Sequence, residues 1–298
     1  MPKTLVIGAS GFVGGYLVRE LESAGHDVFQ ANYPEFNLLD RSAVESAVRK
    51  ADPDFVVNLA AVSSVGESWK EPLTTVDVNV KGVLHLLNAV QEFSPEAKTL
   101  LVGSAEEYAP KNSPLKETDP LEASNPYGIT KIAQENFASL YRKKYGMKIV
   151  CTRSFNHTGV GQSPRFALPS FVKQVAKIDL SHAPGKIFVG NLDAVRDFSD
   201  VEDVAHVYRM LLETENEFSV YNVGSGISRS MTELLQMIVG LTKVPIEIVR
   251  DPARMRPVDI PYLCADNSRV QKFWRGTDIR TTVQKMFESY RNTLEDRS

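Results

Sequence analysis

The chain has 298 residues, of which 43% are hydrophobic and 24% are charged, and its formal net charge at pH 7 is -3. This composition is typical of a globular protein long enough to divide its core between two domains. The small negative charge argues against nucleic acid or an anionic membrane as a partner. No apolar run approaches the ~20 residues of a membrane span, so we expect none.

The cysteines and the N-terminus indicate the cellular compartment. Cys151 and Cys264 lie far apart in apolar surroundings, so we expect two buried thiols and no disulfide. The first expected strand starts at Lys3 or Thr4, which leaves no room for a signal peptide. These features predict a cytoplasmic protein. Outside the loop at 153–162, the histidines lack the spacing of metal ligands, and we predict no metal.

The first chemical signal is a glycine-spaced turn. The apolar residues 4–7 precede Gly8-Ala-Ser-Gly-Phe-Val-Gly14, and residues 16–24 have helical periodicity. A strand, a glycine turn and a helix suit a dinucleotide pyrophosphate, because the backbone approaches closely and the helix start offers unpaired N–H groups. The alternative is a purely structural turn. The residues assigned to cofactor binding here are Gly8, Ser10, Gly11, Phe12 and Val13.

Further cofactor contacts are expected after the second strand. This strand, expected over residues 26–31, ends at Asn32, where NAD-preferring enzymes usually carry an acidic residue for the ribose. Asn32 does not repel a 2′-phosphate, yet no arginine stands beside it, so NAD and NADP both stay open. Asn37 and Leu38 are placed to flank an adenine ring. Asp40 is expected to cap the helix that follows.

The next two strands lead to residues that face the cofactor and the substrate. The strand expected over 55–61 ends in small residues, and Leu59, Ala60 and Ala61 are expected to line the cofactor. A helix over 77–90 and a strand over 99–102 follow, and this strand delivers Ser104 and Glu106. Ligands of an open parallel sheet bind beyond the carboxyl ends of its strands. Ser104 is therefore placed to hydrogen-bond a substrate carbonyl or hydroxyl, with a loop cap as the alternative.

The strongest chemical signal is Tyr127-Gly-Ile-Thr-Lys131, at the start of a helix that we expect to end near Tyr145. Residues four apart share a helix face, so the phenol and the ammonium can point at the same group. A neighbouring lysine lowers the pKa of a tyrosine below its ordinary value of about 10, and an oxidised nicotinamide would lower it further. This pair predicts acid–base chemistry. The alternative is a surface lysine packed over a ring.

After a strand expected over residues 149–152 the alternation of strands and helices breaks. We predict an α/β fold, with a doubly wound parallel-sheet Rossmann domain and a smaller, interleaved C-terminal α/β substrate lobe. The Rossmann domain is expected to comprise residues 1–155 and about 200–223, and the lobe about 156–199 and 224–298. Arg196 and Arg256 are available for a diphosphate, which the arginine fork binds through two hydrogen bonds.

Taken in order, these motifs resemble the extended short-chain dehydrogenase/reductase superfamily, in its nucleotide-sugar branch. The resemblance covers nearly the whole chain. It implies NAD(P)(H) as the cofactor, a homodimer formed through two helices of each subunit, and Ser104, Tyr127 and Lys131 as catalytic residues. The motifs that carry it are Gly8-x-x-Gly11-x-x-Gly14, Asn58-Leu-Ala-Ala61, Ser104, Tyr127-x-x-x-Lys131 and Arg196-Asp-Phe198.

Within that branch, residues 155–162 and 256–260 are similar to the GDP-6-deoxy-4-keto-D-mannose reductases and the GDP-mannose 4,6-dehydratases. This similarity implies a GDP-sugar as the partner, with residues 166–173 at the base. It places Asn156, Arg196 and Arg256 at the diphosphate, Asp259 at the ribose and Glu106 beside the sugar.

The activity implied is NAD(P)H-dependent reduction of the C4 ketone of GDP-4-keto-6-deoxy-D-mannose, which forms GDP-D-rhamnose. Thr158-Gly-Val160 departs from the Glu-Ser-Pro of the dehydratases, whereas Glu106 occupies the position of their C5 base. Residues 65–68 are shared with sugar epimerases. A dehydratase or 4-epimerase that retains NAD(P) is therefore the alternative, and a non-catalytic dinucleotide-binding protein is a minor one.

Overall fold

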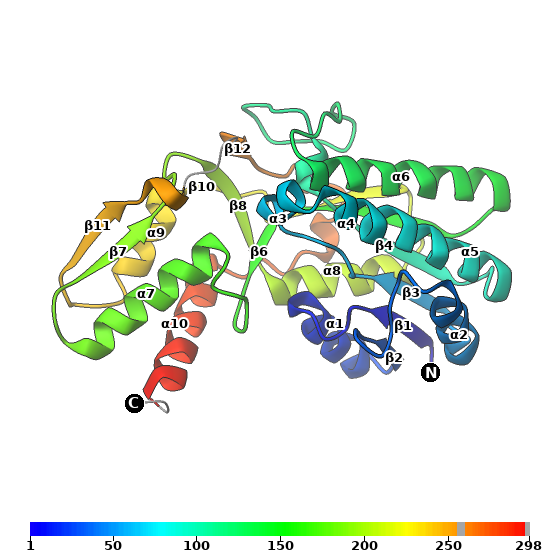
Figure 1. Cartoon of the computed structure of the whole chain (residues 1–298), viewed down its shortest axis with the longest axis horizontal. Helices are drawn as coiled ribbons and strands as arrows, with labels where there is room; N and C mark the ends of the chain where they lie inside the picture. The colour runs from blue at the N-terminus through cyan, green and yellow to red at the C-terminus, as the bar shows by residue number, and fades with distance from the viewer. Residues whose placement is uncertain (255–259, 296–298) are drawn as a thin grey trace.

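The computed structural model describes residues 1–254 and 260–295. Its larger part is a parallel sheet of six strands in the order β2-β1-β3-β4-β5-β9 (Figure 1). This order is that of a doubly wound Rossmann sheet, and it confirms the predicted fold class. The strands are β1 (Lys3–Ile7), β2 (Asp27–Ala31), β3 (Phe55–Asn58), β4 (Lys98–Ser104), β5 (Ile149–Ser154) and β9 (Val220–Val223).

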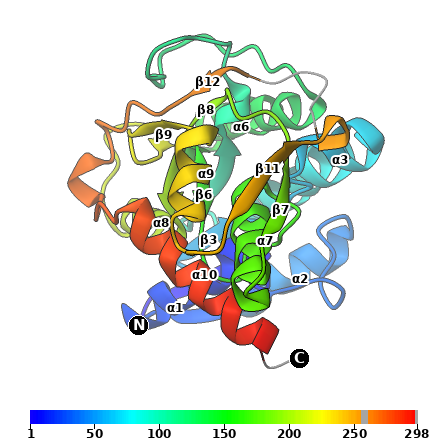
Figure 2. The same ribbon diagram turned by 90° about the vertical axis from the view of Figure 1, so that its left-hand side faces the viewer.

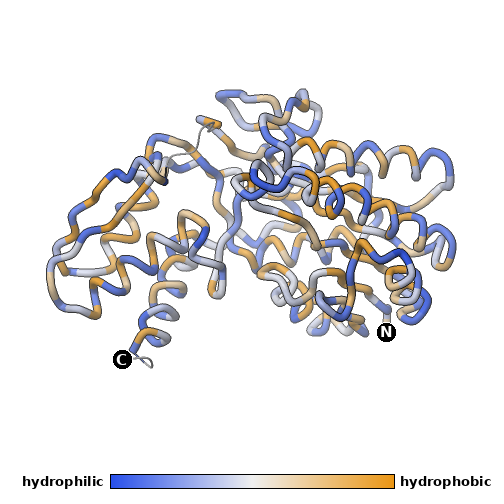
Figure 3. The backbone as a smooth tube through the Cα atoms, in the orientation of Figure 1, coloured by the Kyte–Doolittle hydropathy of each residue, from blue (hydrophilic) through white to orange (hydrophobic). Residues whose placement is uncertain are grey.

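Helices cover both faces of this sheet, because successive side chains of a strand point to opposite faces. Leu5 and Ile7 pack with α2 (Arg41–Ala51), α5 (Val83–Phe93) and α6 (Pro126–Tyr145), whereas Val6 packs with α1 (Phe12–Ser23) and α8 (Val201–Glu213). In Figure 1, α5 and α6 lie above the sheet and α1 and α8 below it. Figure 3 shows hydrophobic and hydrophilic residues alternating along α5 and α6, as one-sided burial requires.

The smaller lobe has a hydrophobic core of its own, which α7, α9 and α10 share with strand residues such as Ile187 and Val189. In its mixed sheet, β8 lies between β10 and β12, and β6 also pairs with β8, while β7 and β11 form a separate pair (Figure 2). The elements are β6 (Asn156–Thr158), α7 (Ala167–Ser181), β7 (Gly185–Val189), β8 (Val195–Asp200), β10 (Ser228–Ser230), α9 (Met231–Val239), β11 (Ile246–Arg250), β12 (Tyr262–Leu263) and α10 (Ile279–Glu295).

Several element boundaries differ from those predicted. The strand expected over 55–61 ends at Asn58, because the Asn58 side chain accepts the N–H of Ala60 at 3.2 Å and turns the chain. The helix expected over 77–90 is a π-helix, η1 (Asp77–Gly82), that continues into α5. Two short helices precede it, α3 (Val65–Lys70) and α4 (Pro72–Val76).

The predictions for the two cysteines and for Asp40 are confirmed. Cys151 and Cys264 are free and buried, as expected from their apolar surroundings. Asp40 caps α2, accepting the N–H groups of Ser42 and Ala43. In the part of the chain that the structure describes, no helix is long and apolar enough to cross a membrane. Within residues 1–254 and 260–295, no cluster of His, Cys, Asp and Glu could hold a metal ion.

The glycine turn brings β1, α1 and the end of β3 into close contact. Gly8 has a φ of 80°, which favours glycine, and a Cβ there would lie 3.0 Å from the nitrogen of Ala60. A Cβ at Gly14 would overlap the carbonyl oxygen of Gly8 and lie 2.5 Å from that of Ala9. A Cβ at Gly15, one residue further along α1, would meet only the Arg19 side chain, at 3.8 Å.

We therefore expect Gly14→Ala and Gly15→Ala to have opposite effects. Gly14→Ala forces backbone atoms apart and should destabilise the fold by about 1–3 kcal/mol. Gly15→Ala adds a good helix former in open space and should stabilise it by about 0.5–1 kcal/mol. Urea unfolding of both variants measures the difference, and equal stabilities would contradict this account of the turn.

A buried ion pair fixes α6 on the sheet. Arg153 of β5 donates two hydrogen bonds to the carboxylate of Glu135, at 3.0 and 2.7 Å. It also donates to the hydroxyl of Tyr108 and to the carbonyl of Glu117, both at 3.0 Å. The Tyr108 hydroxyl in turn donates to Asn222 of β9 at 2.6 Å, so the network spans β5, α6 and β9.

Removing one partner of such a pair leaves a buried charge without compensation. We expect Arg153→Met to lower the free energy of unfolding by about 3 kcal/mol or more. Arg41→Met is the matched control, because Arg41 pairs with Glu45 on the exposed surface of α2. It should leave the urea midpoint unchanged. Similar midpoints for both variants would show that the Arg153 network does not stabilise the fold.

Candidate active site

The glycine turn and the start of α1 form one side of the candidate site. Gly11 precedes α1 without any side-chain capping hydrogen bond, so the first N–H groups of the helix can bind an anion. The N–H of Ser10 donates to the side-chain oxygen of Asn32 at 2.7 Å, which ties the turn to the end of β2. The sequence pattern alone did not predict this hydrogen bond.

The predicted adenine contacts lie beyond the turn. Leu38 is buried in the core, where its side chain would lie 2.8 Å from a Cβ at Gly82, while Asn37 is exposed. The Asn37 side chain accepts the N–H of Leu39 at 3.0 Å. Leu59, Ala60 and Ala61 form the loop after β3 and are partly exposed. Contact of these residues with a cofactor stays a prediction.

Asn79 of η1 joins that loop to α6. Its side chain accepts the N–H of Val62 at 2.9 Å, donates to the Val62 carbonyl at 3.1 Å and donates to the Thr130 hydroxyl at 3.0 Å. Thr130 donates in turn to the carbonyl of Tyr127 at 2.7 Å. No role was predicted for Asn79, although a polar amide side chain within an otherwise apolar helix indicates a specific hydrogen-bonding role.

Tyr127 and Ser104 meet where α6 begins next to the end of β4. Asn125 caps α6, accepting the N–H of Gly128 at 2.9 Å, and the N–H of Tyr127 donates to the Ser68 hydroxyl at 3.2 Å. The side chains of Tyr127 and Ser104 lie close enough for the Ser104 hydroxyl to influence the pKa of Tyr127. Ser104 also caps the short helix η2 (Ala105–Glu107), which confirms the interpretation as a cap, whereas its hydrogen bond to a substrate stays a prediction.

Lys131 lies one turn along α6, with its nitrogen 5.9 Å from the centre of the Tyr127 ring. It donates to the Val102 carbonyl at 2.7 Å and to the Gln134 side chain at 3.3 Å, and burial lowers its pKa to about 8. Burial also raises the pKa of Tyr127, and the carboxylate of Glu107 adds to that rise. The pKa of Tyr127 therefore lies above its ordinary value, because desolvation disfavours the phenolate, and the lowering expected from Lys131 and a bound nicotinamide stays a prediction.

Glu106 lies between Ser104 and α6. Its N–H donates to the Ser104 hydroxyl at 3.2 Å, and its carboxylate accepts from the amide of Asn125 at 2.8 Å. The structure thus brings four predicted site residues together, Ser104, Glu106, Tyr127 and Lys131. Sequence analysis missed the role of Asn125, although an Asn just ahead of Pro126 is a common helix start.

Strand β6 and the loop that follows it pack against the start of α1. The His157 ring stacks on Phe12 with 6.3 Å between ring centres, and the Tyr16 hydroxyl donates to the Val160 carbonyl at 2.8 Å. Burial lowers the pKa of His157, which keeps the ring neutral at pH 7. Phe12, predicted to contact the cofactor, is therefore shared between the glycine turn and this loop.

The predicted diphosphate ligands lie on the mixed sheet. Asn156 of β6 is opposite Phe198 of β8, two residues from Arg196, so Asn156 and Arg196 face the same side of this sheet. Arg196 is buried and donates to the carbonyl of Val195 at 2.9 Å. The other two, Arg256 and Asp259, lie outside the described residues.

Asp197, beside Arg196, fixes the loops around β8. It is buried and accepts the N–H groups of Ser225 at 2.9 Å, Gly226 at 2.9 Å and Ala265 at 3.2 Å. Burial raises its pKa, which these hydrogen bonds partly offset. Its role is structural, because its oxygens are already bound to the backbone.

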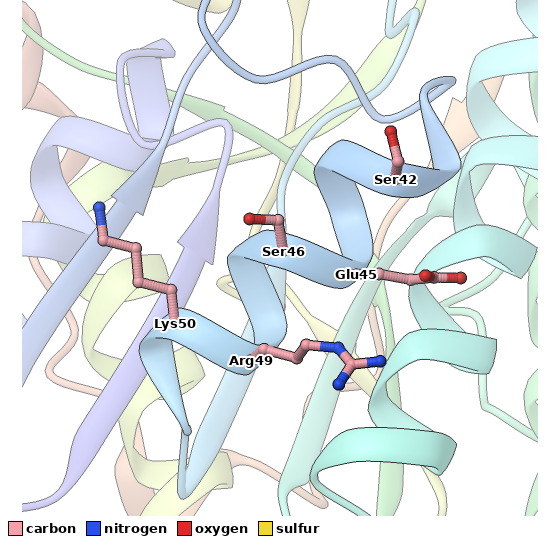
Figure 4. A pocket seen from close by; sticks show the side chains of 5 residues that line it. All are labelled: Ser42, Glu45, Ser46, Arg49 and Lys50. Carbon is pink, nitrogen blue, oxygen red and sulfur yellow. The ribbon is translucent and has the colours of Figure 1, made fainter.

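A hollow of about 440 Å³ lies elsewhere, on the outer surface of α2 (Figure 4). It contains no residue predicted to bind cofactor or substrate, and we assign it no function. Its lining residues are Ser42, Glu45, Ser46, Arg49 and Lys50.

Comparison with known proteins gives close relatives. A family model described as GDP-mannose 4,6 dehydratase matches residues 30–286. The GDP-6-deoxy-D-mannose reductase of Pseudomonas aeruginosa is 32% identical over 258 residues, covering 85% of this chain and 84% of the relative. The structure of RMD from Pseudomonas aeruginosa complexed with NADPH has a TM-score of 0.88 and 27% identity, covering 98% of this chain and 99% of that one.

An epimerase is also similar. The structure of UDP-glucose 4-epimerase from Thermus thermophilus, in complex with NAD, has a TM-score of 0.83 and 25% identity, covering 97% of this chain and 98% of that one. These proteins share the arrangement of a Rossmann sheet and a smaller C-terminal lobe. The chain belongs to the GDP-mannose 4,6-dehydratase family within the extended short-chain dehydrogenases/reductases, and it is an NAD(P)-dependent enzyme that modifies nucleotide sugars.

Proposed function

We propose that the protein reduces the C4 ketone of a nucleotide-linked 4-keto-6-deoxy sugar, specifically GDP-4-keto-6-deoxy-D-mannose to GDP-D-rhamnose. One observation carries this proposal. Tyr127 is buried, lies near Ser104 and is kept protonated by its raised pKa, so it suits the role of a proton donor. The similarity to a GDP-6-deoxy-D-mannose reductase supports the choice of substrate.

Each side chain of the group has a distinct part in this reaction. Reduced nicotinamide, when bound, supplies the hydride to C4. The Ser104 hydroxyl donates a hydrogen bond to the ketone oxygen, and Tyr127 donates its proton to that oxygen as negative charge develops there. Lys131 stabilises the resulting phenolate and binds the nicotinamide ribose. Positioned proton transfer of this kind typically accelerates a reaction by about 10²–10⁴-fold.

The remaining residues are assigned to cofactor or to substrate according to the domain in which they lie. Residues 1–155 and about 200–223 bind NAD(P)H, and about 156–199 and 224–298 bind the nucleotide sugar. In the second part, Asn156, Arg196 and Arg256 hold the diphosphate, Asp259 the ribose and residues 166–173 the base. The cofactor is held by Gly8, Ser10, Gly11, Phe12, Val13, Asn32, Asn37, Leu38, Leu59, Ala60, Ala61, Tyr127 and Lys131.

A second candidate function is a dehydratase or 4-epimerase that retains its cofactor through the cycle. The observation that favours it is Glu106, whose carboxylate stands beside Ser104 and could remove a proton from the sugar. Asn125 holds one oxygen of that carboxylate at 2.8 Å, which orients it. The two functions differ in whether NAD(P)H is consumed.

Cofactor stoichiometry therefore separates the two functions. With GDP-4-keto-6-deoxy-D-mannose, we expect one NADH or NADPH to be oxidised for each sugar reduced, followed as loss of nicotinamide absorbance. Conversion of GDP-mannose or a UDP-hexose without added cofactor would instead establish the second function.

The proton-donor role is tested by Tyr127→Phe, which removes the hydroxyl and keeps the ring. We expect kcat to fall by about 10²–10⁴-fold while the affinity for NAD(P)H, measured by fluorescence titration, stays the same. Tyr145→Phe is the matched control, since Tyr145 lies at the far end of the same helix and is 44% exposed, and its kcat should not change. Unchanged kcat in Tyr127→Phe would remove the basis of the proposal.

We also propose that the protein is a cytoplasmic homodimer. Large apolar side chains are exposed on α3 and α4, which pack beside α6, where Ile129 and Leu140 are exposed as well. An exposed apolar patch of this kind is typical of an interface. The residues on α3 and α4 are Trp69, Leu73 and Val76.

A charged side chain introduced into this apolar patch should separate the two subunits of the proposed dimer. Leu73 is 79% exposed, and we expect Leu73→Glu to shift the mass measured by light scattering from dimer to monomer. Ile248→Glu, on β11, is the control and should stay dimeric, because Ile248 is exposed on the other lobe. A monomeric parent protein would contradict the proposal directly.

A further inference from the structure

Glu107 is a buried carboxyl directly behind Ser104. Its side chain is 0% exposed, and one oxygen accepts the N–H of Ser104 at 2.7 Å. A Cβ at Gly103 would lie 2.5 Å from that oxygen, so the carboxyl fills the space that any larger residue at 103 would need. The carboxyl is therefore built into the end of β4, where Ser104 is presented.

As far as the structure describes the chain, the groups around Glu107 leave one of its carboxyl oxygens without a hydrogen bond. The short helix η2 packs against β5 and α6, which bring Arg153 and the Cys151 thiol from one side and Lys131, Glu135 and Tyr127 from the other. The guanidinium of Arg153 is already bound to Glu135, and its nearest nitrogen lies 3.9 Å from the second oxygen of Glu107. That oxygen has no hydrogen-bond partner among the described residues.

This environment favours the neutral acid. Burial, followed by the charge of Glu135, raises the pKa of Glu107 to about 8, against the opposing effects of Ser104, Arg153 and Lys131. When Glu107 does ionise, its charge raises the pKa of Tyr127 and that of Lys131. The charge next to the Tyr127 and Lys131 pair thus changes at the pH at which Glu107 titrates.

We propose that Glu107 is a positioning residue of the active site, which holds the backbone of Ser104 and whose ionisation sets the charge that Tyr127 and Lys131 experience. This inference rests on the proposed reduction, in which Tyr127 must be protonated. Above the pKa of Glu107, its carboxylate keeps the proton on Tyr127 and extends activity to higher pH. A merely structural Glu107 would hold Ser104 at every pH without this effect.

Two substitutions separate the two parts of the proposal. Glu107→Gln keeps an oxygen for the Ser104 N–H but never ionises, so the alkaline limb of the kcat profile for ketone reduction should move down by about one pH unit. Glu107→Leu loses the acceptor as well, and at pH 7 its kcat should fall about tenfold or more below that of Glu107→Gln. Both profiles are measured from pH 6 to beyond about pH 10, the ordinary pKa of a tyrosine, because the pKa of Tyr127 is raised above that value.

Glu122→Gln is the control for these profiles, because Glu122 is exposed and contacts Glu107 only through its own N–H, at 3.0 Å. Its profile should match that of the parent protein. If the alkaline limb of the Glu107→Gln profile lay at the same pH as that of the parent protein, the proposed effect of the Glu107 charge would be wrong. Equal kcat values for Glu107→Gln and Glu107→Leu at pH 7 would overturn the positioning of Ser104.

Infrared difference spectra test the neutral acid without relying on catalysis. The parent protein minus Glu107→Gln should show the carbonyl band of a protonated carboxyl at pH 6, and the band should fade above about pH 8. Its absence at pH 6 would overturn the inference. If the parent reduced no 4-keto sugar while the band were present, the proposed function would fail and the protonation of Glu107 would stand.

Discussion

The active site depends on how closely α6 approaches the end of β4. A Cβ at Gly128 would overlap the carbonyl oxygen of Glu106 and lie 2.8 Å from the Cβ of Ala123, so no residue larger than glycine fits there. This approach brings Tyr127 near Ser104 and lets Lys131 reach the carbonyl of Val102, one strand residue before Gly103. Asn125 and Thr130 hold the helix start from either side. The geometry of the proton donor therefore follows from one glycine contact and the caps around it.

The same approach buries Tyr127, Lys131 and Glu107, and burial shifts the pKa of each of them. Desolvation raises the pKa of Tyr127, lowers that of Lys131 to about 8 and raises that of Glu107 to about 8. The phenol is therefore protonated at neutral pH, as the proton donor of the proposed reduction must be.

Local patterns in the sequence predicted most of the framework, because they depend on neighbours in the chain. The apolar runs placed strands β1 to β5 within a few residues of their observed bounds, and the spacing of Tyr127 and Lys131 indicated the core of the site. Contacts between distant residues could not be predicted in this way. Nothing next to Glu107 in the sequence indicates Arg153 or the space left by Gly103. The same holds for Asn222, whose partners Tyr108 and Leu115 are more than 100 residues away.

The two lobes are joined by an aromatic stack and by a hydrogen bond. Asn156 and His157 belong to β6 of the mixed sheet, and the His157 ring stacks on Phe12 at the start of α1. Asp200 caps α8 of the Rossmann sheet and accepts from Thr282 of α10 at 2.6 Å. A shift of the smaller lobe would therefore move both the glycine turn and α8. In the proposed reaction C4 of the sugar must lie close to the nicotinamide, and these contacts between the lobes would help to hold the two proposed ligand sites together.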